Sequence, residues 1–87
     1  MNVFDEINWN MNEMNKLAIG LAERGIEFKL RYLWHGMQIL CDTWDAVCHD
    51  SSYGHENGLI EVMGTVCRSE DDDVEGWLTA DEILSRL

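Results

Sequence analysis

The stretch IEFKLRYLWHGMQILCDTWDAVC, residues 26–48, decides the fold class of this chain. In its first part, the apolar residues Ile26, Phe28, Leu30 and Tyr32 alternate with charged ones. A period of two is typical of a strand that buries one face. We therefore predict a strand that ends where a His-Gly pair interrupts the alternation.

The second part of the same stretch predicts two more strands. Residues 37–42 and 44–48 each place three apolar side chains on one face, and residues 42–43 are expected to turn the chain between them. The inward-facing residues of these two strands are Met37, Ile39, Cys41, Trp44, Ala46 and Cys48. Consecutive strands joined by short turns predict an antiparallel sheet.

A helix is predicted before this sheet, over residues 8–24. Asn10 precedes Glu13 by three positions, as in a capping box, and Gly25 suits the left-handed position that follows a last helical turn. Between these two signals, apolar residues recur at helical spacing at Met14, Leu17, Ala18, Leu21 and Ala22.

A second helix is predicted after the sheet, over residues 55–67, because apolar residues again recur at helical spacing. Gly58 and Gly64 lie inside it, and each costs about 1 kcal/mol relative to alanine in a helix. The apolar residues in question are Leu59, Ile60, Met63 and Val66.

The last part of the chain predicts an acidic connector, SEDDD, then a short edge strand, VEGWL, and then a helix opened by the capping-box pair Thr79 and Glu82. The whole chain, residues 1–87, is expected to form a single α+β domain. Its small antiparallel sheet would have three or four strands covered by two or three helices, in the order α-β-β-β-α-(β)-α.

The charge of the chain narrows the class of partner. Six Lys and Arg stand against 17 Asp and Glu, which gives a formal net charge of −11. A nucleic-acid binder must neutralise phosphates with cationic side chains, and an anionic membrane surface attracts cations, so we expect neither as a direct partner. The acidity favours a protein partner with a basic surface, such as one that normally holds nucleic acid.

The first residues of the chain and its number of cysteines predict the cellular compartment of the protein. MNVFDEINW has neither the basic nor the apolar region of a signal peptide, and no apolar run approaches the roughly 18 residues that a membrane span needs. Three cysteines cannot form a closed disulfide set. We expect a cytoplasmic protein in a reducing compartment, where clustered Cys and His indicate metal binding or simple packing.

The segment CDTWDAVCHDSSYGHENG, residues 41–58, holds two of the three cysteines and two of the three histidines. Structural zinc takes about four Cys or His ligands in a tetrahedron. The predicted hairpin brings Cys48, His49 and His55 to the end of the sheet that holds His35, so we predict a Zn²⁺ site on these four residues.

Cys41 and Cys67 are alternative ligands for that site. Cys48 and His49 can both bind only if the strand has ended there, because neighbours in a strand point to opposite faces. Metal-free alternatives are that the cysteines are apolar core residues and that the histidines bind nearby backbone groups.

Catalysis is not expected. A catalytic triad can consist of Cys, His and Asp, the residue types found at Cys48, His49 and Asp50. Consecutive residues, however, cannot align a nucleophile, a base and an orienting group. The sequence also has no P-loop, nucleophile elbow or dinucleotide-binding fingerprint.

A partner-binding surface is predicted from the acidic connector and one tryptophan. The acids are either a solvated connector or part of a docking surface with Trp34, which the hairpin end is expected to expose. The predicted partner-binding residues are Trp34, Glu70, Asp71, Asp72, Asp73 and Glu75.

Several motifs resemble a known group of proteins. FDEINWNM, WDAVCH, SYGHE and DDVEGWLTADEIL are similar to a family of small acidic proteins from phages and prophages of Firmicutes. In size, charge and Cys/His content, the chain resembles type II-A anti-CRISPR proteins, at least one of which contains zinc. That resemblance implies a non-enzymatic inhibitor that binds Cas9 in the host cell and blocks DNA loading, with zinc as a structural cofactor.

Two alternatives remain open at this point. One is a metal-free prophage accessory or regulatory module that binds another protein. The other is a cysteine-dependent or metal-dependent hydrolase, which would need a concave pocket with an open ligand position.

Overall fold

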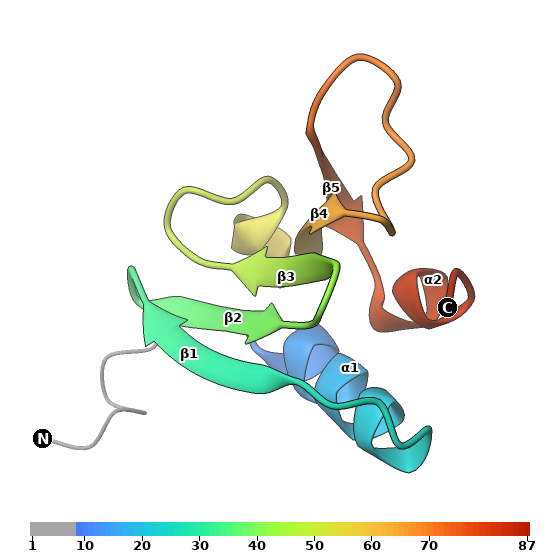
Figure 1. The fold of residues 1–87 in the computed structure, drawn as a ribbon. Helices are drawn as coiled ribbons and strands as arrows, with labels where there is room; N and C mark the ends of the chain where they lie inside the picture. Colours follow the sequence, from blue (N-terminus) through green and yellow to red (C-terminus); the bar gives the residue numbers. More distant parts are fainter. Residues whose placement is uncertain (1–8) are drawn as a thin grey trace, which may run out of the picture.

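The computed structural model describes residues 9–87, which form one five-stranded sheet and two helices (Figure 1). The elements in chain order are α1 (Asn12–Glu23), β1 (Lys29–Leu33), β2 (Gly36–Leu40), β3 (Trp44–Cys48), a 3₁₀ turn (His55–Asn57), β4 (Ile60–Gly64), β5 (Val74–Leu78) and α2 (Ala80–Leu84). The predicted α+β class is confirmed. Each described helix is too short or too polar to cross a bilayer.

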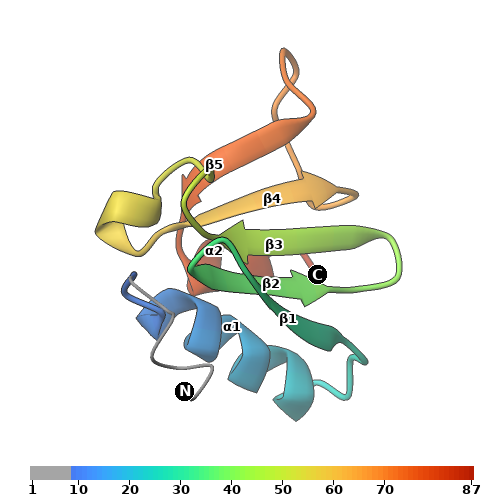
Figure 2. The same ribbon diagram turned by 90° about the vertical axis from the view of Figure 1, so that its left-hand side faces the viewer.

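The sheet is an antiparallel meander in which each strand pairs with the next one along the chain (Figure 2). Opposite Cα partners include Leu30 with Ile39, Ile39 with Ala46, and Ala46 with Val62. Directly opposite residues share a face, so this row fixes which side chains of the first four strands point toward the helices.

Both helices pack on that one face of the sheet. The core joins Met14, Leu17 and Leu21 of α1 to Ile83 of α2, and all four side chains are fully buried. The sheet contributes alternate residues of its strands, in agreement with the inward set predicted for residues 37–48. These strand residues of the core are Met37, Ile39, Trp44, Ala46, Cys48, Ile60, Val62 and Leu78.

The helix ends agree in part with the capping predictions. Thr79 Oγ1 accepts a hydrogen bond from the backbone N–H of Glu82 at 3.2 Å, so the predicted cap of α2 is confirmed. At α1, Asn10 Oδ1 accepts from the N–H of Asn12, whereas Glu13 reaches across to accept from the N–H of Ala80. The first helix was expected to begin at residue 8, which lies outside the described residues; within them, α1 begins at Asn12.

The helix predicted over residues 55–67 is wrong. Only His55–Asn57 forms a 3₁₀ turn, and Ile60–Gly64 is strand β4, paired with β3. Gly58 and Gly64 hold left-handed backbone, with φ of 70° and 100°, which interrupts a right-handed helix at both places. The sheet therefore has five strands rather than three or four, and the described residues form two α-helices.

The first strand is shorter than its alternation predicted. β1 begins at Lys29, and Ile26 and Phe28 lie before it, packed against the core and partly buried. Leu30 and Tyr32 point to the helix side of the sheet by register but are 46% and 40% exposed. The strand lies at the edge of the sheet, where it has a neighbouring strand on one side only.

Candidate functional site

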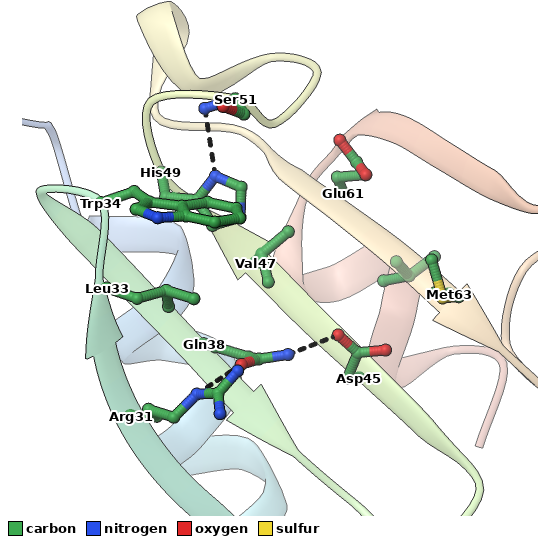
Figure 3. Close-up of a pocket in the computed structure, with 11 residues that line it drawn as sticks. Arg31, Leu33, Trp34, Gln38, Asp45, Val47, His49, Ser51, Glu61 and Met63 are labelled. Atoms are coloured by element: carbon green, nitrogen blue, oxygen red, sulfur yellow. Dashed lines mark hydrogen bonds between the residues drawn. The ribbon is translucent and has the colours of Figure 1, made fainter.

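The face of the sheet opposite the helices carries a depression of about 320 Å³ (Figure 3). We call it the open-face depression. Residues of the first four strands and of the two loops at one end of the sheet form it together. Its lining residues are Arg31, Leu33, Trp34, Gln38, Asp45, Val47, His49, Ser51, Glu61, Val62 and Met63.

A polar row crosses one side of this depression. Arg31 Nε donates to Gln38 Oε1 at 2.9 Å, and Gln38 Nε2 donates to Asp45 Oδ2 at 2.8 Å (Figure 3). The three residues lie on adjacent strands β1, β2 and β3. The Gln38 amide thus bridges the Arg31 guanidinium and the Asp45 carboxylate, which form no direct ion pair with each other.

Two aromatic rings form the opposite side. Trp34 lies in the turn between β1 and β2, is 60% exposed, and meets the His49 ring edge to face at a centroid distance of 4.8 Å. His49 Nδ1 accepts a hydrogen bond from the backbone N–H of Ser51, and burial lowers the pKa of this imidazole. His49 is therefore neutral at neutral pH, with its proton on Nε2.

Asp50 ties three segments together beside this depression. Its Oδ1 accepts from Trp9 Nε1 at 2.7 Å, and its Oδ2 lies 2.6 Å from His35 Nδ1. The hydrogen bond with His35 first, and that with Trp9 second, lowers the pKa of the Asp50 carboxyl. The carboxylate thereby fixes the β1–β2 turn and the start of the described chain to the loop after β3.

The four predicted zinc ligands lie at the same end of the sheet, but they do not converge. Cys48 faces the helices, whereas His49 faces the open-face depression. His35 pairs with Asp50, and His55 Nδ1 bonds to the backbone oxygen of Ser52 at 2.5 Å. Within residues 9–87, no three His, Cys, Asp or Glu side chains are grouped to hold a metal ion.

The ligand set therefore does not fit zinc in this conformation, and the zinc site stays a prediction. The alternative ligands Cys41 and Cys67 are partly buried against the core, at the end of the sheet where Thr43 Oγ1 lies 2.9 Å from Thr65 Oγ1. It is strand β4, and not a helix, that carries the chain back to that end.

The Cys48 thiol has the environment of a core group. It is fully buried, its Sγ lies 4.0 Å from the backbone oxygen of Asn10, and burial raises its pKa to about 11. Thiolate is the nucleophilic and metal-binding form of cysteine. At neutral pH this sulfur is protonated and serves as apolar packing.

The predicted partner-binding acids separate into two groups. Glu70, Asp71, Asp72 and Asp73 are exposed on the long connector between β4 and β5, which extends away from the helices in Figure 1. Glu75 instead forms a two-pronged ion pair with Arg86, at 2.7 and 3.0 Å, and accepts from the N–H of Arg68. Glu75 is thus a structural residue of the sheet edge.

Four polar residues that line the depression were not predicted from the sequence to belong to a site, namely Arg31, Gln38, Asp45 and Glu61. They gather because antiparallel register places Arg31 opposite Gln38, Gln38 opposite Val47, and Val47 opposite Glu61. The only sequence signal was their shared parity within each strand, which depends on knowing the register.

Comparisons with protein-family models, with curated proteins and with solved structures return no match for this chain.

Proposed function

We propose that this protein is a non-enzymatic inhibitor that binds a host defence nuclease through its acidic surface and blocks the loading of DNA. The observation that carries the proposal is the acidic connector, which presents four consecutive exposed carboxylates, Glu70–Asp73, beyond the edge of the sheet. A concentrated negative field of this kind speeds association with a basic protein groove and competes with phosphates for it.

The disposition of the basic residues supports the same proposal. Four of the six Lys and Arg side chains bind partners within the chain, two of them as ion pairs with carboxylates and two through neutral oxygens. These pairs are Lys16 with Asp81, Arg24 with the backbone oxygen of Leu84, Arg31 with Gln38, and Arg86 with Glu75. Since each ion pair neutralises one acid together with one base, the excess of carboxylates stays at the −11 of the composition, and it determines the sign of the outward field.

Cas9 is the proposed partner because the chain resembles type II-A anti-CRISPR proteins in size, charge and Cys/His content. Cas9 holds its nucleic acids in a positively charged channel, which is the kind of surface that a charge of −11 complements. The protonated, fully buried Cys48 thiol supports a binding role rather than nucleophilic catalysis.

The proposal is tested by titrating purified Cas9–guide complex with the protein and measuring both binding and target-DNA loading. We expect stoichiometric binding that weakens as salt is added, together with loss of DNA loading. The connector variant Asp71→Asn/Asp72→Asn/Asp73→Asn is expected to weaken binding about tenfold.

A matched variant controls for net charge. Glu23→Gln/Glu27→Gln/Asp42→Asn removes three exposed acids from the end of α1, the loop before β1 and the β2–β3 turn, toward the β1 edge of the sheet, and should change binding less than about twofold. Equal weakening by both variants would contradict the role of the connector. Absence of binding to Cas9 would overturn that partner and favour the metal-free accessory module, whose partner a pull-down from host lysate would then identify.

A further inference from the structure

We propose that the open-face depression is a binding site for an arginine side chain of the partner protein. The guanidinium would stack on the Trp34 indole and pair with the carboxylate of Glu61, over the apolar floor formed by Val47. This inference rests on the proposed function only in taking the partner to be a basic protein. It adds a second contact surface, distinct from the acidic connector.

The backbone at Trp34 is the first observation that points to this site. Trp34 and His35 have φ of 45° and 58°, a left-handed conformation that glycine and asparagine adopt far more readily than bulky residues. The turn nevertheless holds a tryptophan whose ring is 60% exposed at the rim of a depression. An unfavourable backbone conformation combined with an exposed indole is expected where the ring contacts a ligand.

The charges of the depression are the second observation. Asp45 and Glu61 supply two carboxylates, and among the hydrogen bonds of residues 9–87 each uses one oxygen, Asp45 Oδ2 for Gln38 and Glu61 Oε2 for the N–H of Tyr53. A second oxygen of each carboxylate is therefore left for a ligand. The neutral His49 ring adds no positive charge.

Arg31 decides where in the depression a cation would bind. Its guanidinium is held by Gln38 at the β1 corner, and Figure 3 shows it on the side away from Glu61. Repulsion from Arg31 directs an incoming cation to the region above Val47, between the Trp34–His49 rings and Glu61. The same view shows this region bounded by carboxylate on one side and by aromatic rings on the other.

The geometry favours arginine over lysine. A guanidinium is planar, stacks on an indole face, and pairs with a carboxylate through two parallel N–H groups. A lysine ammonium is a compact, strongly hydrated charge that gains less from the indole face.

The experiment is an NMR titration of the ¹⁵N-labelled full chain with Nα-acetyl-arginine methylamide. The matched probes are the lysine analogue and the citrulline analogue, which has nearly the shape of arginine without its charge. We expect saturable shifts of the Trp34 indole N–H and of the Val47 and Glu61 amides, with a dissociation constant on the order of millimolar. The lysine probe should bind about threefold more weakly, and the citrulline probe about tenfold more weakly.

Variants locate the site. Trp34→Ala and Glu61→Gln should each weaken arginine binding about fivefold, whereas Trp34→Tyr should retain most of it and Glu27→Gln all of it. Glu61→Gln keeps an oxygen for the Tyr53 N–H, and the spectrum of each variant shows whether the fold is intact.

Failure of this inference can be told apart from failure of the proposed function. Arginine-probe shifts that centre on residues 70–73, or that do not saturate, would overturn the site. Cas9 binding unaffected by Trp34→Ala and Glu61→Gln would also overturn it, while leaving the proposed function intact. Saturable binding in the depression by a chain that does not bind Cas9 would support the site and contradict the choice of Cas9.

Discussion

Individual side chains of this protein hold the end of the sheet together through contacts that are distant in sequence. The Asp50 carboxylate accepts a hydrogen bond from the Trp9 indole N–H and pairs with His35. The backbone N–H of Asp50 donates to the backbone oxygen of Trp34 at 3.0 Å. These bonds stabilise the left-handed turn at residues 34–35. They also keep the Trp34 ring against His49, at the rim of the open-face depression.

The pairing of Glu75 with Arg86 makes a pH-dependent prediction at this scale. The Arg86 guanidinium, with a smaller contribution from the Arg68 N–H, lowers the pKa of Glu75 from 4.5 to about 2. Because the folded pKa is depressed, the stabilisation is fully present above pH 4.5 and is lost as the pH falls toward 2. Glu75→Gln should lower the free energy of unfolding by about 1 kcal/mol at neutral pH, since the pair is partly exposed.

Urea denaturation at neutral pH and near pH 2 measures this difference, with Glu70→Gln on the exposed connector as the matched control. We expect the difference between wild type and Glu75→Gln to vanish at the acidic end. A difference that persists there would show that the loss at Glu75 is not electrostatic.

At the scale of elements, β2 and β3 approach so closely at one end that only glycine fits between them. A Cβ atom on Gly36 would lie 1.9 Å from the backbone oxygen of Cys48 and 2.6 Å from the Cα of His49. Both contacts are with backbone, so no rotamer change can relieve them. The depression depends on this close approach, because it places the Trp34 turn beside His49.

Gly36→Ala should therefore destabilise the fold by about 3 kcal/mol or more, since the strands must separate to admit the methyl group. Gly25→Ala is the matched control, because a Cβ there meets no atom within 4 Å and only the left-handed backbone, with φ of 70°, costs about 1 kcal/mol. Thermal and urea denaturation of the two variants give the comparison. Equal losses would contradict the close approach at Gly36.

The cap of α2 gives a second prediction for an element. α2 has only five residues, and the Thr79 hydroxyl both accepts from the Glu82 N–H and donates to Glu82 Oε1 at 3.2 Å. Thr79→Ala should cost about 1 kcal/mol of stability, and Thr79→Ser, which keeps the hydroxyl, much less. If urea denaturation showed the two variants to be equally stable, the cap would contribute nothing measurable.

At the scale of the whole molecule, zinc and packing compete as explanations of the Cys/His segment. In this conformation Cys48 lies in the core while the three histidines lie outside it, so we expect Cys48→Ser to leave the zinc content unchanged. The same change should lower stability by about 1–3 kcal/mol, because it buries a hydroxyl among apolar side chains.

Elemental analysis of untagged wild type, Cys48→Ser and His55→Ala measures the metal content directly. One equivalent of zinc in the wild type that is lost in both variants would confirm the predicted four-residue site. It would also show that the metal-bound chain adopts a different arrangement around residues 48–55.

The sequence by itself determined the features that depend on near neighbours. Alternation and turn residues predicted the strands now seen as β2, β3 and β5 and located the start of the α2 helix, because strand faces and caps are set by residues only a few positions apart. Composition alone gave the net charge of −11.

Only the tertiary structure determined that residues 60–64 form strand β4 and that the lining residues of the open-face depression come together. Leu59, Ile60, Met63 and Val66 fit a helical spacing, yet Ile60 and Val62 also alternate with Glu61 and Met63, and pairing with β3 selected the strand. The depression unites Arg31 with Glu61, thirty positions apart in the sequence, through the register of four strands. Local patterns specify which side chains share a face, but only inter-strand hydrogen bonding specifies which of them become neighbours.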